Sequence, residues 1–203
     1  MICFFDTETS GVPNKHSTRL ELQPHIMQLA ISLYDSERRP VYEVSTLVAL
    51  PETATCSPEA LETHGITPEL SRRYGVQPVQ AIALLRYACK RAELVVAHNL
   101  QFDEKLVEYA VQRAGQDLSP LVPVTKFCTL EATTPILRLP PTESMIKWGH
   151  GDKFKSPKLE EAYRHFFGEE ISGAHDALVD TRACARVYYH LLDNGLDTLD
   201  AVR

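Results

Sequence analysis

Acidic side chains at the start of the chain have the types and spacing that divalent-metal chemistry needs. Asp6 and Glu8 are separated by one residue and follow the apolar run 2–5. Side chains two positions apart on a strand point to the same face, so both carboxylates can bind one cation. Without a cation, two buried carboxylates would repel each other and lose their hydration. Taken alone, such a pair is more typical of a solvated turn, and the rest of the sequence has to decide.

Two more carboxylates follow apolar segments. Asp103 lies in the first turn of an expected helix that comes after the apolar run 94–97. An Asp at that position commonly caps a helix or complements its dipole. Asp180 lies in the middle of a second expected helix, among residues that should be packed. A packed carboxylate needs a partner, although a solvated helix face is the alternative for Asp180.

His175 is a candidate general base, since an imidazole pKa near ~6.5 suits proton abstraction from water at neutral pH. It precedes Asp180 by five residues, which is about 140° around a regular helix, so the two cannot share one helical face. If His175 instead stands at or just before the helix start, after residues 172–173, its ring is free to reach the carboxylates. An ordinary core or surface histidine is the other interpretation.

The apolar patterns predict the elements that carry these residues. Strands are expected over residues 2–5, 26–34, 41–50, 94–97 and 122–128. Helices are expected to start at 57–59 and 67–69 and to cover 78–92, 101–114, 129–137, 158–167 and 174–193. This order predicts an α/β fold with a mixed β-sheet and helices packed on its faces. In such folds, sites gather where strands end at the sheet edge.

Bulk composition is compatible with one domain over residues 1–203, with 44% hydrophobic residues and a mean hydropathy of −0.19. No apolar run approaches the ~18 residues of a membrane span, and the first residues lack a basic leader. We therefore expect a cytoplasmic protein with no membrane contact. The five cysteines show no metal-ligand spacing, which favours reduced, packed thiols: Cys3, Cys56, Cys89, Cys128 and Cys184.

The net charge of −6 argues weakly against a nucleic-acid partner, because bound cations would offset the clustered carboxylates. Residues 144–158 carry Lys147, Lys153, Lys155 and Lys158 against Asp152, interleaved with Trp148 and Phe154. Such a segment can follow a phosphate backbone and stack on a base. A solvated loop whose aromatic side chains pack on the domain is an equal alternative.

Taken together, three motifs resemble those of the DEDDh exonucleases, a branch of the DnaQ-like, RNase H-like superfamily that includes proofreading subunits and three-prime repair exonucleases. The matching segments are residues 4–11 (FFDTETSG), 97–103 (AHNLQFD) and 175–183 (HDALVDTRA), and residues 62–67 (ETHGIT) are similar to a further family segment near the substrate. Ser10 and Cys128 depart from common family residues, and neither is a predicted reactive residue. Ala177 stands where the sibling branch has Tyr, which favours the histidine-containing branch.

The resemblance implies an RNase H-like fold and 3′→5′ exonuclease activity that releases 5′-nucleoside monophosphates. Asp6, Glu8, Asp103 and Asp180 would hold two divalent cations, Mg²⁺ or Mn²⁺, and His175 would be the general base. Asp6 would bridge the two ions. The residues that match the family's terminal-nucleotide pocket are Thr9, His64, Asn99 and Phe102, although Phe102 is equally suited to the core and His64 to a turn.

The expected substrate is a nucleic acid with a free 3′ end. DNA, single-stranded or frayed, is favoured over RNA because the first two motifs look closer to proofreading and DNA-repair members. An RNA exonuclease of the same fold is the first alternative. A catalytically silent nucleic-acid-binding or polymerase-accessory domain is the second, and the presence of all five reactive residues argues against it. A DNA polymerase is a possible partner, and the sequence does not indicate an oligomeric state.

Overall fold

A five-stranded mixed sheet organises the computed structural model, which describes residues 1–116, 120–121 and 124–195. The spatial order of the strands is β3-β2-β1-β4-β5. β1 pairs antiparallel with β2 and parallel with β4; β2–β3 is antiparallel and β4–β5 parallel. The strands are β1 (Ile2–Thr9), β2 (Ile26–Tyr34), β3 (Pro40–Leu47), β4 (Leu94–Ala97) and β5 (Thr125–Cys128). The predicted mixed sheet is confirmed.

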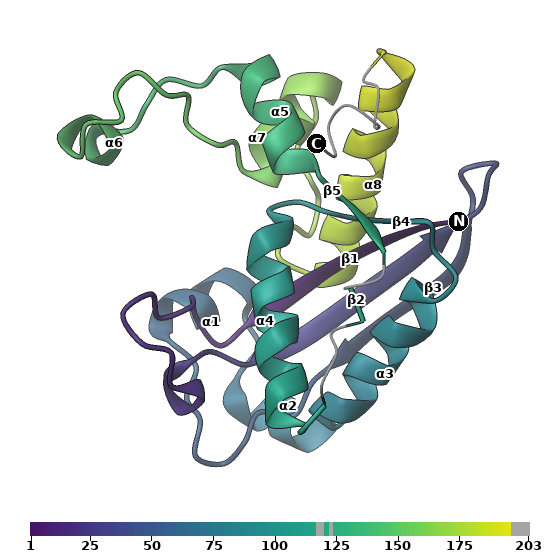
Figure 1. The fold of residues 1–203 in the computed structure, drawn as a ribbon, viewed down its shortest axis with the longest axis vertical. Helices are drawn as coiled ribbons and strands as arrows, with labels where there is room; N and C mark the ends of the chain where they lie inside the picture. Colours follow the sequence, from purple (N-terminus) through teal and green to yellow (C-terminus); the bar gives the residue numbers. More distant parts are fainter. Residues whose placement is uncertain (117–119, 122–123, 196–203) are drawn as a thin grey trace.

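Helices cover both faces of the sheet (Figure 1). α8 packs on β1 and β2 on one face with α7 beside it, whereas α3 and α4 pack on the other face. The α-helices are α1 (Pro58–His64), α2 (Pro68–Tyr74), α3 (Pro78–Cys89), α4 (Leu100–Arg113), α5 (Thr129–Leu137), α6 (Glu143–Lys147), α7 (Leu159–Phe167) and α8 (Ala177–Asp193), and a 3-10 turn covers Leu20–Leu22. The predicted packing of helices on both faces is also confirmed.

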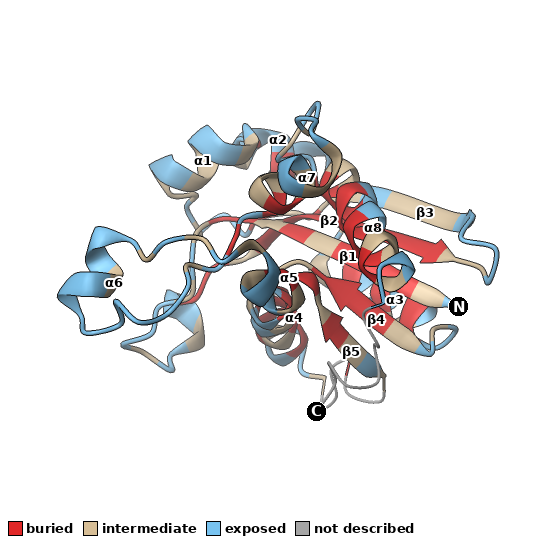
Figure 2. Ribbon diagram, turned by 90° about the horizontal axis from the view of Figure 1, so that it is seen from above, coloured by how far each residue is buried: buried red, intermediate tan, exposed pale blue. Residues whose placement is uncertain are grey.

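Alternation along β1 divides the core into two layers. Cys3 and Phe5 are buried against α3 and α4, whereas Phe4 is buried against α8. Because strand side chains alternate, Asp6 and Glu8 follow Phe4 onto the α8 side, and Thr7 follows Phe5 onto the α4 side. Figure 2 shows that the buried residues follow the sheet and the helix surfaces facing it. The alternation of side chains along β1 therefore decides whether each polar side chain faces α8 or α4.

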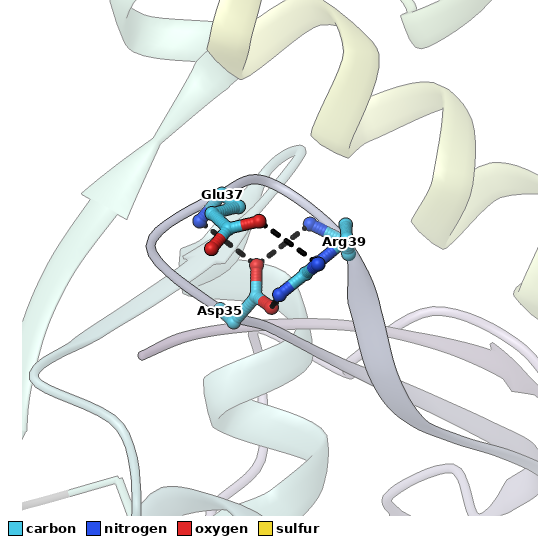
Figure 3. Close-up of polar contacts among 3 residues, drawn as sticks. All are labelled: Asp35, Glu37 and Arg39. Atoms are coloured by element: carbon cyan, nitrogen blue, oxygen red, sulfur yellow. Dashed lines mark hydrogen bonds and ion pairs between the residues drawn. The ribbon is translucent and has the colours of Figure 1, made fainter.

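The turn between β2 and β3 is closed by an acidic side chain (Figure 3). The Oδ1 atom of Asp35 accepts the backbone N–H groups of Glu37 and Arg39, both at 2.9 Å. Its Oδ2 atom accepts the Nε and Nη2 donors of Arg39 at 3.0 and 2.8 Å. An Asp that bonds the backbone two residues on is typical of tight turns. This turn therefore closes an antiparallel hairpin between β2 and β3.

Three strand boundaries were predicted wrongly. β1 continues through Glu8 to Thr9 instead of ending at residue 5, because β2 pairs beside it along its whole length. Asp6 and Glu8 thus lie within the strand and not in a loop after it. The third strand covers 40–47 and not 41–50, since Val48 bridges to Val76. The last strand covers 125–128 in place of 122–128, and residues 122–123 lie outside the described residues.

The helix expected over 174–193 begins only at Ala177, because Asp176 is its N-cap and accepts the N–H groups of Leu178 and Val179. Asp180 was predicted to lie mid-helix, but it lies in the first turn of α8. His175 precedes the helix, which is the arrangement that leaves its ring free. Smaller shifts affect 78–92, 101–114 and 158–167, which are helical over 78–89, 100–113 and 159–167. α6, which overlaps the start of the segment 144–158, was not predicted.

The described cysteines all carry free thiols, as expected from their spacing. Trp148 and Phe154 are exposed at 73% and 46% of their surface. The alternative that the aromatic residues of 144–158 pack on the domain is therefore wrong. In the part of the chain that the structure describes, none of the helices is both long and apolar enough to span a bilayer.

Candidate active site

The C-terminal ends of two parallel strands bring the predicted reactive residues together. Asp6 and Glu8 occupy the second half of β1, and β4 lies parallel beside it. β4 ends at Ala97, and α4 begins three residues later with Asp103 in its first turn. α8 crosses β1 and supplies Asp180 from its own first turn. Four carboxylates from one strand and two helices thus converge at one edge of the sheet.

A cavity of about 350 Å³ collects these residues. Its lining includes all five residues predicted to be reactive, together with Asn99 and Phe102. An adjoining cavity of about 450 Å³ shares Glu8 and Phe102 with the first and is lined by Thr9 and His64. All nine residues predicted for the site therefore line one of two connected hollows.

Thr7 fixes the position of Asp103. Its hydroxyl donates a hydrogen bond of 2.7 Å to Oδ1 of Asp103, and its backbone N–H donates to the same oxygen at 3.1 Å. Asp103 is 2% exposed, so its carboxylate is almost fully withdrawn from solvent. Asp103 lies in the first turn of α4, where a carboxylate complements the helix dipole, and its Oδ1 atom also accepts bonds from β1 across the sheet edge. Both of the bonds to Oδ1 aim the carboxylate toward the cavity.

His175 and Asp180 are joined through the backbone. The N–H of His175 donates to Oδ2 of Asp180 at 3.0 Å, and His175 has a φ of 68°, in the left-handed region. This turn lets the chain double back before the helix starts. The imidazole is 45% exposed, and its Nε2 atom lies 3.4 Å from Oε1 of Glu160 on α7. The ring is thus held at the mouth of the cavity by its backbone and by an acidic neighbour.

Burial raises the pKa values of all four carboxylates, and neighbouring negative charges add to this effect at Asp6, Glu8 and Asp180. Burial and the charges of Asp103, Glu8 and Asp180 hold the pKa of Asp6 well above its usual range. Burial, with the charge of Asp180, raises the pKa of Glu8 to about 8. Burial raises the pKa of Asp103 to about 7 against the opposing bonds from Thr7, and that of Asp180 to about 6. Such mutual repulsion is relieved when positive charge is bound among the carboxylates.

The site also fits a divalent cation by geometry. Ligand atoms of Glu8, His175 and Asp180 lie within 4.8 Å of one another. Asp180 is 9% exposed, and its Oδ1 atom is buried without a hydrogen-bond partner among the described residues. A buried carboxylate oxygen without a partner is costly unless a cation or a water completes it. The oxygen-rich donor set matches the preference of Mg²⁺ and Mn²⁺.

The residues predicted to bind the terminal nucleotide frame the second cavity. His64 is the last residue of α1, and its Nε2–H donates to the backbone carbonyl of Thr9 at 3.1 Å. The Thr9 hydroxyl donates to the carbonyl of Gly11 at 2.8 Å, and its side chain is buried. These bonds fix the end of β1 against α1. Phe102 is half-buried, so it both packs on the core and lines the cavities.

Four residues of the site were missed. Glu160 was treated only as part of a helix start, and Gln28 only as part of an apolar strand. Gln28 binds both Asp176 and the N–H of Ala177, which fixes the start of α8 on the sheet. His98 was considered only as part of the motif 97–103. Its Nδ1 atom lies 2.9 Å from the Thr129 hydroxyl, and its Nε2 atom lies 3.0 Å from the Pro157 carbonyl. Thr7 has no distinguishing sequence signal, whereas a lone Gln inside residues 26–34 is visible as an anomaly.

Comparison with known proteins adds the decisive observation: the RNase T exonuclease family model matches residues 3–188. The chain belongs to this exonuclease family. It is a 3′→5′ exonuclease of the DnaQ-like, DEDDh type, as its motifs predicted. Exonucleases of the family depend on divalent metal ions, in agreement with the donor set described above.

Relatives of this exonuclease cover most of its length. Ribonuclease T of Shewanella baltica is 28% identical over 93% of this chain and 79% of its own, and that of Haemophilus influenzae is 25% identical over 93% and 78%. E. coli Exonuclease I in complex with a dT13 oligonucleotide superimposes with a TM-score of 0.72 at 20% identity over 94% of this chain. This chain spans 40% of that structure, and the likeness establishes the RNase H-like fold.

Proposed function

We propose that this exonuclease removes nucleotides one at a time from the 3′ end of single-stranded DNA. Water attacks the phosphorus of the terminal phosphodiester, and the bond from phosphorus to the 3′ oxygen of the preceding nucleotide breaks. The terminal nucleotide is released as a 5′-nucleoside monophosphate, and the 3′ oxygen takes up a proton to become the new 3′ hydroxyl of the strand. The observation that carries this proposal is the buried Oδ1 atom of Asp180, which has no hydrogen-bond partner among the described residues and lies beside Glu8. It supports cation binding at the edge where all four carboxylates meet.

In this proposal Asp6, Glu8, Asp103 and Asp180 would hold two divalent cations. When bound, Mg²⁺ or Mn²⁺ at these positions would acidify the attacking water and stabilise the negative charge that develops on the leaving oxygen. Thr7 keeps Asp103 oriented for this role through its two bonds to Oδ1. The raised pKa values of Glu8 and Asp103 support it, because a cation would favour the ionised form of both groups.

His175 is proposed as the general base. Its ring is exposed at the cavity mouth, and its own N–H, rather than its imidazole, binds Asp180. A ring nitrogen is thus free to take the proton from the attacking water. The Glu160 carboxylate, 3.4 Å from Nε2, would stabilise the imidazolium that forms. This pairing also restricts the ring to positions near the carboxylates.

The terminal nucleotide is proposed to enter the cavity between β1 and α1. Phe102 offers an aromatic face to its base, and Asn99, in a left-handed conformation, exposes its amide beside it. Thr9 and His64 form the opposite wall and keep it rigid through their mutual bond.

RNA is the second candidate substrate, and the ribonuclease T relatives favour it. DNA and RNA oligonucleotides of one sequence, labelled at the 5′ end, would be digested side by side with Mg²⁺, Mn²⁺ or EDTA. The proposal predicts a cation-dependent ladder that shortens from the 3′ end, faster on DNA. Faster shortening of RNA would mean that RNA, and not DNA, is the preferred substrate of the same 3′→5′ exonuclease reaction. If neither the DNA nor the RNA oligonucleotide gave a ladder, the proposed function would be contradicted.

A further inference from the structure

The segment 139–155, called here the arm, projects from the body beyond the active site (Figures 1 and 2). Leu139 and Lys155 pair as an antiparallel bridge at its base, and α6 lies near its tip. The arm exposes apolar side chains that the core does not use: Ile146 at 59%, Trp148 at 73% and Phe154 at 46% of their surface. We call these three exposed side chains the platform.

The base of the arm is attached to the active site. Lys155 donates to both carboxylate oxygens of Glu161 at 2.5 and 2.6 Å. Two residues further on, the buried Pro157 accepts the Nε2–H of His98, which follows the end of β4. Residues 156–160 then line the cavity that holds the carboxylates. The arm is therefore continuous with the wall of the active site, and its position is fixed by residues of that wall.

The charges of the arm distinguish its partner. Lys147 and Lys153 are exposed, and neither forms an ion pair with another described residue, whereas Lys155 pairs with Glu161. The arm contains three lysines and two acidic residues in a chain whose net charge is −6. An exposed indole beside lysines suits stacked bases and phosphates. An apolar protein partner would not use the two ammonium groups.

We propose that the arm binds the substrate strand on the 5′ side of the scissile phosphodiester, with Trp148 stacking on a base and Lys147 and Lys153 contacting phosphates. This inference rests on the proposed function, because the strand whose 3′ end occupies the cavity has to leave along its wall. The arm thereby adds affinity for strands long enough to reach it. Lys155 acts as an anchor of the arm and not as a phosphate contact.

Trp148 provides a direct test, because it is the single tryptophan of the sequence. Oligo-dT would be titrated with Ca²⁺ in place of Mg²⁺, so that binding is seen without turnover, while tryptophan emission is recorded. The proposal predicts a saturable change in Trp148 emission with long strands and none with a dinucleotide. Emission that stays constant while a labelled strand binds would overturn the proposal. A change that follows protein concentration without nucleic acid would indicate a second copy of the chain on the platform and would equally contradict it.

Variants separate the arm from the catalytic cavity. Trp148→Ala should raise KM several-fold on long strands and leave the dinucleotide rate unchanged, while Trp148→Phe should restore most of the affinity. Lys147→Gln with Lys153→Gln should reduce the slope of log Kd against log salt by about 0.7 per lysine. Lys90→Gln, just after the end of α3, and Tyr74→Ala, at the end of α2, change exposed residues outside the arm and are the matched controls.

Each outcome has one meaning. A wild-type protein that hydrolyses no oligonucleotide defeats the proposed function itself. A wild-type protein that hydrolyses oligonucleotides, with arm variants identical to the controls at every strand length, defeats the arm proposal alone. Because Trp148 is 73% exposed, its replacement should leave the melting temperature unchanged, which a thermal melt checks.

Discussion

The backbone N–H of His175 donates a hydrogen bond to Oδ2 of Asp180 at 3.0 Å. This bond connects the proposed base to a proposed cation ligand without using the imidazole. Oδ2 is thereby satisfied, while Oδ1 of the same carboxylate is left without a partner among the described residues. One oxygen holds the chain, and the other is available to a cation. The two roles of the site can therefore be separated by mutation of the His175 side chain.

Replacement of His175 by Asn tests the general base. Asn adopts left-handed backbone conformations more readily than most residues, so the φ of 68° and the bond to Asp180 should survive. We expect kcat to fall by about 10²- to 10⁴-fold, the range of general-base contributions. Mn²⁺ affinity, measured by calorimetry, should remain within a few-fold of wild type. A variant with wild-type kcat would remove His175 from this role.

The Thr7 hydroxyl is expected to tune the cation site through Asp103. Thr7→Val removes the 2.7 Å bond to Oδ1 but keeps the backbone bond of 3.1 Å. Cation affinity should fall by about 10-fold, the lower end for partners that orient a metal ligand. Thr7→Ser restores the hydroxyl and is the matched control. Equal Mn²⁺ affinity in the Val and Ser variants would show that this bond does not orient the ligand.

Stability of the cation-free protein should fall as pH rises. In the folded state, the pKa of Asp103 is raised to about 7 and that of Glu8 to about 8, above their ordinary values of 3.8 and 4.5. The folded state thus holds these protons more tightly than the unfolded chain, and the stability this provides is lost as pH rises toward about 8. His25 acts in the opposite direction, because burial and Arg113 lower its pKa to about 4. The stability that the neutral His25 side chain provides increases with pH and is fully present above the ordinary pKa of 6.5.

The informative window therefore lies between pH 6.5 and about 8. Melting temperatures in EDTA should fall with pH across this window, and saturating Mg²⁺ should flatten the profile because a cation offsets the charges. Glu8→Gln should flatten the EDTA profile near its upper end. A cation-free protein that becomes more stable across the same window would contradict the assigned burial of these carboxylates.

Phe102 is predicted to act on binding more than on chemistry. Its side chain lines the catalytic cavity, the adjoining cavity and a third hollow beside α4. Loss of base stacking costs about 1–3 kcal/mol per base, so Phe102→Ala should raise KM by about 5- to 150-fold. Phe102→Leu fills much of the core contact without an aromatic face and should behave like the Ala variant. A wild-type KM for the Leu variant would assign Phe102 to the core alone.

Most of the fold was accessible from local patterns in the sequence. The apolar runs of β2 and β4 and the capped starts of α1 and α2 gave elements close to those observed. The ends of β1 and α8 were misplaced because tertiary contacts decide them. β2 extends the ladder of β1 past its polar residues, and Gln28 with Asp176 delays the start of α8. The lone Gln28 is visible in the sequence, but its partner at the start of α8 lies 148 positions away and is not.

The site was predictable to the extent that its chemistry lies in motifs. Asp6, Glu8, Asp103, His175 and Asp180 were identified because carboxylates beside apolar runs are anomalous and because their order resembles a family. Residues that act through distant partners were not identified. Glu160 reaches His175 from α7, and His98 reaches Pro157 across 59 positions of the chain. Such pairs are fixed by packing, which a single sequence does not reveal.

The most direct test of the account compares cation binding with nucleotide release. Equilibrium dialysis with Mn²⁺ and quantification of 5′-nucleoside monophosphates from single-stranded DNA would be carried out on the wild type and on Asp6→Asn. We predict that both quantities rise together with Mn²⁺ concentration in the wild type and that both are lost in the variant, which stays folded. Release of nucleotides by Asp6→Asn at the wild-type rate, or release that continues in EDTA, would contradict a cation-dependent exonuclease site at this edge of the sheet.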